Sequence, residues 1–400
     1  MAKRKPWMKL RHRIVTTIAR PFLTLTAILK YHIKVDKFRA QGERNWLILS
    51  NHQTDFDQFF LGMAFRGPVY YVAMEDLFSM GFLSRLIQWA VAPIPIMKAT
   101  NDVKAVMTCI RLAREGGTIG LFPEGNRTYS GTTCYIKPSV AALAKKLGLP
   151  IAIFRIEGGY GVKPRWADRV RGGKMRAGVR RVIEPEEYAA LSNDELYDLI
   201  CKELWVDESA QTASFPSKYA AEHLERVFYV CPECGLSEFT SAGDTVTCKK
   251  CGAAYRYTAQ CRFENAPFPD PASWYRHQEE FIRQLDLSPY ALSPMYRDSA
   301  EVREVIVYDR KRLLMKDAPI TLCGDRLELG SGANRLVLPF DDIRAMACIA
   351  GHKLNVFYLD VIYQLKGGDS FNALKYCNIY YHAKYVKEGH TDGKFQFLGL

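Results

Sequence analysis

The sequence predicts a chain of several domains, led by an α/β domain with a mostly parallel sheet flanked by helices. Its 400 residues exceed the size of one ordinary hydrophobic core. Short apolar runs alternate with helical patterns in the first half, which is typical of α/β folds, whereas residues 300–400 carry β-rich runs separated by turns. Hydrophobic residues make up 48% of the chain, which excludes a largely disordered protein.

Residues 1–34 form a basic amphipathic segment. Lysines and arginines crowd its start, and an apolar stretch, Ile14–Leu29, follows them at once. The stretch is too short to span a bilayer, so we expect an interfacial helix that bends at Pro21. Trp7 and Tyr31 are then expected at the depth of the lipid headgroups. The alternative is an ordinary amphipathic helix packed on the domain, and the two descriptions can hold together.

The formal net charge of +12 favours an anionic partner, either phospholipid headgroups or nucleic acid. Charge alone does not choose between the two. The basic cluster stands directly before an apolar stretch, and this order suits a membrane surface.

Residues 35–215 carry the α/β pattern. The strand-like apolar runs are Trp46–Leu49, Val69–Ala73, Thr118–Phe122 and Ile151–Ile156. Val103–Arg114 and Pro138–Leu147 have helical periodicity, and Gly116 and Gly148 follow them, where helices commonly end. Because α/β sheets place ligands at the carboxyl ends of their strands, the residues directly after the apolar runs are candidate site positions.

Residues 228–259 hold two C-x2-C pairs, formed by Cys231, Cys234, Cys248 and Cys251. Thiolates at this spacing can close a tetrahedron around zinc, and four protein ligands leave no open position. The sequence therefore predicts a small ribbon with a structural zinc ion. The alternative is four free thiols or two disulfides. The other cysteines are scattered singly, which is typical of a reducing compartment, so we infer the cytoplasmic side.

Residues 300–400 are expected to form several strands followed by one helix. The strand-like runs are Glu304–Tyr308, Arg335–Pro339 and Val356–Gln364, and the helix is expected at Asn372–Val386. This order suggests a small barrel or sandwich that the helix caps. It resembles a pleckstrin-homology-like module in element order alone.

A histidine follows the first predicted strand, in the run Asn51–Asp57 (NHQTDFD). A neutral imidazole can take a proton from a hydroxyl, and a carboxylate on its far nitrogen fixes its tautomer. Asp55 would share a helical face with His52, whereas Asp57 reaches His52 only if the chain between them turns. The alternative is a capping cluster beside a surface histidine.

A second polar motif, Phe122–Thr128 (FPEGNRT), follows the third predicted strand. Gly125 permits close approach of the backbone, and Arg127 offers a planar fork for bidentate binding of phosphate. The motif therefore outlines an anion site. The alternative is a common surface turn.

Together the two motifs resemble the glycerolipid acyltransferase family, typified by 1-acylglycerol-3-phosphate acyltransferases. His-x4-Asp is followed about seventy residues later by Phe-Pro-Glu-Gly-x-Arg, and the resemblance covers roughly residues 35–185. It implies that His52 is the general base and that Asp57 orients it. It also implies a phosphate site for the acceptor that includes Glu124, Gly125 and Arg127.

One family block departs from the usual pattern, because the segment Ala92–Lys98 ends in lysine where the family usually has arginine. Lys98 is a candidate phosphate ligand that keeps the positive charge and loses the bidentate fork. An acceptor other than plain lysophosphatidate becomes more plausible. The alternative is that Lys98 is a solvated surface charge.

The resemblance implies transfer of a fatty acyl group to a hydroxyl of lysophosphatidate or a related lysophospholipid, at the cytoplasmic face of a membrane. The donor would be an acyl thioester, either acyl-CoA or acyl carrier protein. Two other hypotheses stay open, a non-catalytic membrane scaffold that binds lipid and a zinc-ribbon protein that binds nucleic acid. His52 and Asp57 are intact, which argues against the scaffold. The basic residues are spread along the chain, so no nucleic-acid partner is expected.

Overall fold

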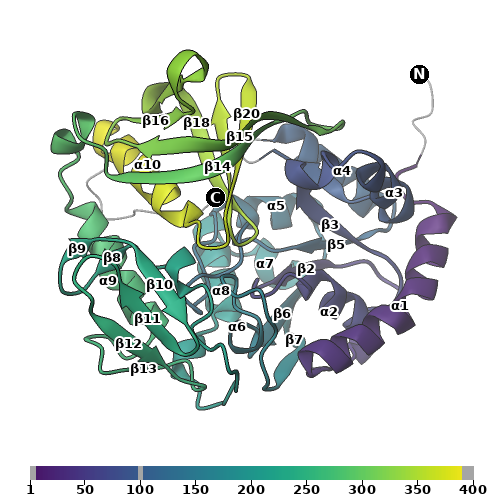
Figure 1. Cartoon of the computed structure of the whole chain (residues 1–400). Coiled ribbons are helices and arrows are strands. Elements are labelled where there is room, and N and C mark those ends of the chain that lie inside the picture. The colour runs from purple at the N-terminus through teal and green to yellow at the C-terminus, as the bar shows by residue number, and fades with distance from the viewer. Residues whose placement is uncertain (1–5, 98–101, 390–400) are drawn as a thin grey trace. The chain divides into compact units, whose positions relative to one another are not determined.

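The computed structural model describes residues 6–97 and 102–389, which form two compact units (Figure 1). Unit 1 runs to Pro164 and resumes at Val170–Phe215. Unit 2 contains Arg165–Arg169 and the described residues from Pro216 onward. Within the described ranges, every helix is either too short or too polar to cross a bilayer.

Unit 1 is built on a seven-stranded sheet in the order β1-β7-β6-β2-β5-β3-β4. Neighbouring strands are parallel except for β6 and β7, which are antiparallel. All four residues of β2 (Leu47–Ser50) are buried, as expected for a strand in the middle of a sheet that helices cover. The predicted α/β sheet with flanking helices is confirmed, and its one antiparallel pair makes it a mixed sheet.

The other strands of unit 1 are β1 (Ile33–Val35), β3 (Val69–Met74), β4 (Ile94–Ile96), β5 (Thr118–Leu121), β6 (Ile151–Glu157) and β7 (Met175–Ile183). The longer helices are α1 (Leu10–Tyr31), α2 (Asp57–Ala64), α3 (Phe82–Val91), α4 (Val103–Arg114), α5 (Ser139–Leu147) and α8 (Asn193–Leu204). The four predicted strands agree with β2, β3, β5 and β6 to within one residue at each end. The helix α4 matches its predicted bounds, and Gly148 ends α5 in the expected left-handed conformation, with a φ of +63°.

The carboxyl ends of β2, β5 and β6 lie at one edge of the sheet, because β2 pairs in parallel with both of the other strands. The loops that leave this edge begin at Asn51, Phe122 and Gly158. These loops include both polar motifs that the sequence singled out. The sheet therefore brings the two motifs together, as its topology predicts.

Helix α1 continues through Pro21 and contacts α2 and α3 (Figure 1). Tyr31, at its end, is buried. The Tyr31 ring stacks on Phe56 with centroids 5.2 Å apart, and its hydroxyl donates to Asp55 Oδ1 at 2.9 Å. The expectation of Tyr31 at headgroup depth is wrong, because its ring packs against the loop that precedes α2.

The first part of unit 2 is a ribbon of short strands. A four-stranded sheet has the order β10-β11-β12-β13, and β8 pairs with β9. The bounds are β8 (Val230–Cys231), β9 (Gly235–Leu236), β10 (Phe239–Ala242), β11 (Thr245–Cys248), β12 (Ala254–Tyr257) and β13 (Phe263–Glu264). Trp274 of α9 (Pro271–Arg283) is fully buried and stacks on Phe228, with centroids 4.2 Å apart, while Tyr255 packs edge-on against it. The ribbon thus has an aromatic core, which a helix beyond residue 259 completes.

The second part of unit 2 is a seven-stranded antiparallel sheet in the order β17-β16-β15-β14-β20-β19-β18. Its strands are β14 (Tyr296–Val305), β15 (Lys311–Leu322), β16 (Arg326–Leu329), β17 (Leu336–Pro339), β18 (Ile343–Ile349), β19 (Lys353–Tyr358) and β20 (Val361–Gly367). Helix α10 (Ala373–Lys387) follows and contacts β18. The predicted β-rich region that ends in a helix is confirmed. The run Val356–Gln364 is two strands, because Leu359 turns the chain with a φ of +46°.

Candidate active site

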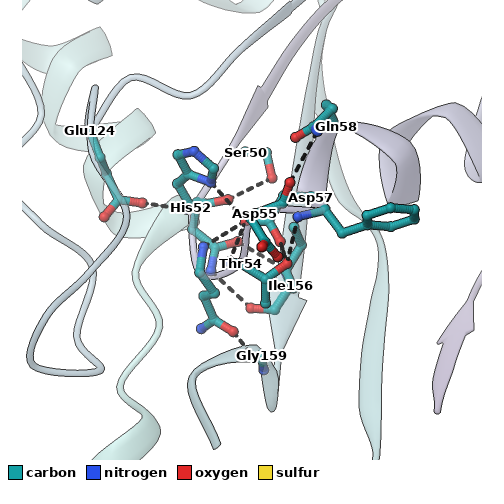
Figure 2. A network of polar contacts seen from close by, with 12 residues as sticks. Ser50, His52, Thr54, Asp55, Asp57, Gln58, Glu124, Ile156 and Gly159 are labelled. Atoms are coloured by element: carbon teal, nitrogen blue, oxygen red, sulfur yellow. Dashed lines mark hydrogen bonds and ion pairs between the residues drawn. The ribbon is translucent and has the colours of Figure 1, made fainter. Parts of the chain in front are cut away.

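His52 and Asp57 meet after the carboxyl end of β2 (Figure 2). Nδ1 of His52 lies 2.8 Å from Oδ2 of Asp57, whose side chain is fully buried. The same oxygen accepts the backbone N–H groups of Gln53 at 2.6 Å and Thr54 at 3.0 Å. Oδ1 accepts the Thr54 hydroxyl at 2.6 Å. These donors replace the water that the carboxylate loses on burial.

The chain turns between His52 and Asp57 instead of forming a helix. The α2 helix begins only at Asp57, so a carboxylate stands in its first turn, where the helix dipole favours negative charge. The turn lets Asp57 reach the imidazole from five residues away. Asp55 accepts the Tyr31 hydroxyl instead. The structure therefore pairs the histidine with Asp57, and the helical geometry that favoured Asp55 does not apply.

The imidazole ring of His52 is held by a stacking contact as well as by the hydrogen bond at Nδ1. Its ring stacks on Phe122, with centroids 4.3 Å apart and an angle of 24° between the planes. The side chain keeps 21% of its surface exposed. Since Nδ1 bonds to Asp57, Nε2 is the ring nitrogen that can exchange a proton with a substrate.

Glu124 is buried, with 2% of its surface exposed. Its Oε1 accepts the backbone N–H of His52 at 2.7 Å, and its Oε2 accepts that of Cys134 at 2.6 Å. Burial raises the pKa of Glu124 to about 8, the charge of Asp57 adds to the rise, and the two N–H donors oppose it. A buried carboxyl group whose oxygens already accept backbone amides is a poor partner for phosphate. Glu124 joins the backbone of two loops, and its role in phosphate binding stays a prediction.

Gly125 forms the tip of the loop after β5. It is exposed, has a φ of +65°, and donates its N–H to the carbonyl oxygen of Phe122 at 3.0 Å. A side chain would strain this tight turn. A few residues later the N–H of Thr128 donates to the carbonyl oxygen of His52 at 3.1 Å. The loop after β5 is thus hydrogen-bonded directly to the loop between β2 and α2, residues 51–56, which we call the histidine loop.

Arg127 is half-buried on the same loop. Burial raises the pKa of Tyr31 above its ordinary value, Asp55 raises it further, and the charge of Arg127 lowers it. Arg127 directly precedes Thr128, whose N–H donates to the carbonyl oxygen of His52, so the two residues lie on loops that are bonded to each other. Lys98 lies outside the described residues.

Three polar residues that the sequence did not single out hold the histidine loop. Asn51 donates to the carbonyl oxygen of Ile156 and accepts its N–H, both at 2.8 Å. Gln53 accepts the N–H of Gly159 at 2.8 Å, and its amide nitrogen donates to Glu208 Oε1 at 2.7 Å. The two amide residues stand beside the histidine in the motif, and this position was the available signal. Glu208 gave no signal, because it lies 155 residues from its partner.

A second candidate site is the cysteine cluster of the ribbon in unit 2. The sulfurs of Cys231, Cys234, Cys248 and Cys251 all lie within 4.8 Å of one another. Two of the sulfur pairs are 3.6 and 3.7 Å apart. Four thiolates about 2.3 Å from a zinc ion at tetrahedral angles would be about 3.8 Å apart, so the cluster has the size of a zinc site. Gly235 and Gly252, which follow the pairs, have φ values of +75° and +76° that let the chain turn.

Three basic side chains in or near the ribbon are paired with carboxylates, whereas Lys250 donates to the carbonyl oxygen of Cys234 at 3.2 Å. The ion pairs are Lys249 with Glu238 (3.4 Å), Arg256 with Asp244 (2.7 Å) and Glu264 (2.8 Å), and Arg262 with Asp270 (2.9 Å). These carboxylates neutralise the positive charge that a nucleic-acid backbone would need. The ribbon therefore gives no support to the nucleic-acid hypothesis.

Comparison with known proteins finds a family match within unit 1. Residues 32–156 match the model of the family described as Acyltransferase. This span contains both the histidine loop and the FPEGNRT loop, and it ends within β6. This part of the chain is therefore similar to acyltransferases, in agreement with the resemblance that the two motifs carry. Glu208, the ribbon and the C-terminal sheet lie outside it.

Particular relatives carry the name 1-acyl-sn-glycerol-3-phosphate acyltransferase. A chloroplastic one from Brassica napus is 24% identical over 163 residues, which are 39% of this chain and 43% of the relative. One from Borreliella burgdorferi is 29% identical over 114 residues, which are 28% of this chain and 46% of the relative. The chain thus spans less than half the length of these relatives. The crystal structure of the 1-acyl-sn-glycerophosphate acyltransferase PlsC from Thermotoga maritima is similar with a TM-score of 0.42 and 20% identity, over 48% of this chain and 78% of that one.

Proposed function

We propose that this chain transfers a fatty acyl group from an acyl thioester to a hydroxyl of lysophosphatidate or a related lysophospholipid. The observation that carries the proposal is the contact of His52 Nδ1 with the buried Asp57, in a loop near Arg127. The family match and the names of the relatives support the class of reaction. Acyl-CoA and acyl carrier protein are both suitable donors, because both present the same thioester carbonyl.

In this mechanism His52 is the general base. Asp57 holds the N–H at Nδ1, which leaves the lone pair at Nε2 for the acceptor hydroxyl. As the hydroxyl oxygen attacks the thioester carbonyl, Nε2 takes its proton, and the charge of Asp57 stabilises the imidazolium. Collapse of the tetrahedral intermediate breaks the carbon–sulfur bond, and the imidazolium returns its proton to the leaving thiolate. The products are an ester and a free thiol.

Arg127 is proposed to bind the acceptor's phosphate, together with the exposed turn at Gly125. A guanidinium presents a planar fork that fits two phosphate oxygens, and an anchored phosphate holds the acceptor hydroxyl close to Nε2. Glu124 contributes indirectly, since it fixes the backbone N–H of His52. Lys98 remains a candidate phosphate ligand on the grounds of its sequence position.

A membrane surface is the proposed partner of unit 1. Helices α1 and α3 contact each other, and both expose apolar side chains. These are Leu10, Ile14, Ile18, Phe22, Leu25 and Leu29 on α1, and Phe82, Leu83, Leu86 and Trp89 on α3. Arg11 links the two helices, because its Nε donates to the carbonyl oxygen of Trp89 at 2.8 Å. Exposed apolar faces beside basic side chains suit the interface of an anionic bilayer, at its cytoplasmic face.

The four cysteines are proposed to bind one structural zinc ion. Their spacing fits four thiolates around a tetrahedral ion, and a complete shell leaves no position for a substrate. The C-terminal sheet is proposed to be a pleckstrin-homology-like module. Seven antiparallel strands followed by one helix support this assignment.

The decisive experiment is an acyl-transfer assay with radiolabelled acyl-CoA and acyl carrier protein over a panel of lysophospholipid acceptors. We expect the wild type to form the diacyl product. His52→Ala is expected to lose about 10²- to 10⁴-fold in rate, the usual contribution of a general base. An unchanged rate in His52→Ala would remove the proposed mechanism.

A non-catalytic scaffold that binds lipid is the second candidate, because the exposed apolar faces of α1 and α3 would serve it equally well. It predicts that wild type and His52→Ala bind phospholipid vesicles alike and that neither transfers an acyl group. The same assay therefore separates the two candidates. A vesicle-flotation measurement on both proteins supplies the binding result.

A further inference from the structure

Glu208 approaches the histidine loop from a segment outside the family match. It begins the short helix η3 (Glu208–Ala210). Its backbone N–H donates to the carbonyl oxygen of Gly131 at 3.0 Å, and Asp207 forms a β-bridge with Thr132. The segment is thus paired with the chain that follows the FPEGNRT loop. Only 4% of the surface of Glu208 is exposed.

One oxygen of Glu208 joins two loops of the candidate active site. Oε1 accepts the amide N–H of the Gln53 side chain and the backbone N–H of Gly158, both at 2.7 Å. Oε2 is buried and has no hydrogen-bond partner among the described residues. Burying a carboxyl group with one oxygen unpaired is unfavourable. A buried residue that carries this cost is a candidate for a functional role.

Gln53 carries the contact from Glu208 toward His52. Its side-chain oxygen accepts the N–H of Gly159 at 2.8 Å, so both ends of its amide are held. Its backbone N–H donates at 2.6 Å to Asp57 Oδ2, the oxygen that also contacts His52 Nδ1 at 2.8 Å. A continuous series of short contacts therefore runs from Glu208 through Gln53 and Asp57 to the imidazole.

We propose that Glu208 is a positioning residue for acyl transfer, which acts through the Gln53 side chain on the backbone that holds Asp57 against His52. This inference rests on the proposed function and adds to it a residue beyond the matched span 32–156. Proton transfer needs Nε2 within hydrogen-bond distance of the acceptor hydroxyl, and a displacement of about 1 Å can cost about 10²-fold in rate.

Two substitutions separate positioning from simple support of the fold. Glu208→Ala leaves the donors of Gln53 and Gly158 without their acceptor, whereas the amide oxygen of Glu208→Gln can accept both. We expect Glu208→Ala to lose about 10- to 100-fold in kcat while KM for the acyl donor stays within about twofold. Glu208→Gln is expected to recover kcat to within about threefold of the wild type, because it keeps the contact.

A double-mutant cycle tests the route through Gln53. If Glu208 acts through this side chain, the double variant of Glu208→Ala and Gln53→Ala loses no more kcat than the worse single variant. Independent effects would multiply instead. Multiplied losses, or a loss confined to KM, would overturn the positioning role.

Hydrogen exchange of the wild type and the variants separates this inference from the proposed function. The amides of Gln53 and Thr54 donate to Asp57, and we expect them to exchange faster in Glu208→Ala and at the wild-type rate in Glu208→Gln. Unchanged exchange in Glu208→Ala overturns the positioning role even if the wild type is active. A wild type that transfers no acyl group removes the proposed function and leaves the exchange result standing. If Glu208→Ala does not fold, Glu208→Asp, which withdraws the oxygen from Gln53, carries the same expectations.

Discussion

Replacing Asp57 by asparagine removes one charge and keeps the shape of the side chain. The Asp57 carboxylate is buried, and its Oδ2 accepts two backbone N–H groups and faces His52 Nδ1. In Asp57→Asn the amide oxygen can keep those contacts, and the amide nitrogen can donate to the Thr54 hydroxyl. The turn before α2 is therefore expected to persist. The variant isolates the effect of the charge.

The charge of Asp57 matters most when His52 becomes an imidazolium. With Nδ1 and Oδ2 2.8 Å apart, the two charges would be centred about 4 Å apart and would attract by about 4 kcal/mol at an effective dielectric constant of about 20. Since about 1.36 kcal/mol corresponds to a tenfold change in rate, we expect Asp57→Asn to lower kcat about 10³-fold. Asp55→Asn is the matched control, because Asp55 lies in the same loop and contacts Tyr31 instead of the imidazole.

The assay is kcat as a function of pH at saturating donor and acceptor. An imidazolium without its counter-charge loses its proton more readily, so the acidic limb of the profile is expected to move to lower pH in Asp57→Asn. Asp55→Asn is expected to keep the wild-type profile. A kcat for Asp57→Asn within tenfold of the wild type, or an equal loss in Asp55→Asn, would refute the reasoning.

Three other features give testable outcomes. In the folded state the pKa of Glu124 is raised to about 8 from an ordinary value of 4.5, so the free energy of unfolding of the wild type should fall as the pH rises across that interval. Urea unfolding at pH 5 and pH 8 should show a smaller fall in Glu124→Gln than in the wild type. An equal fall in both proteins would contradict the raised pKa of Glu124. Cys231→Ser should lower the zinc content, measured by elemental mass spectrometry, and the melting temperature of unit 2; unchanged zinc would rule out the four-cysteine site. Phe82→Asp should weaken flotation with anionic vesicles. The control is Leu292→Asp, at a residue of unit 2 that is 96% exposed, which should bind the vesicles as the wild type does. Equal vesicle binding by Phe82→Asp and the wild type would exclude α3 from the membrane surface.

The central strands of unit 1 could be predicted because they are buried on both faces. The strands β2 and β6 read as nearly continuous apolar runs bounded by turn residues. The strand β7 could not be predicted in this way, because Arg176, Arg180 and Arg181 interrupt its pattern. Arg176 pairs with Asp36 and Arg180 with Glu157, and neither partner is adjacent in sequence. β7 is a strand because its backbone pairs with β6 on one side and with β1 on the other, and both partners lie far from most of it in the sequence. A local reading of the sequence does not reveal this pairing.

The candidate site was predictable as a pair of motifs but not as a network. The choice of Asp57 over Asp55 came from the family resemblance, and the turn before α2 explains it. The contact of Glu124 with the backbone of His52 joins residues 72 positions apart. No spacing rule relates residues at such a distance, so the positioning roles proposed for Glu124 and Glu208 could be inferred only from the fold.

Two buried carboxyl groups hold His52 from different sides. Asp57 contacts the ring nitrogen, and Glu124 contacts the backbone N–H. Burial raises the pKa of Glu124 to about 8, and the nearby charge of Asp57 adds to the rise, because two negative charges so close to each other are unfavourable. A raised pKa means that Glu124 binds a proton more readily, which lowers the repulsion between the two groups. The Asp57 side chain accepts from four donors. Different environments thus divide the work of two similar groups. In the proposed mechanism, Glu124 anchors the backbone and Asp57 supplies the charge that an imidazolium needs.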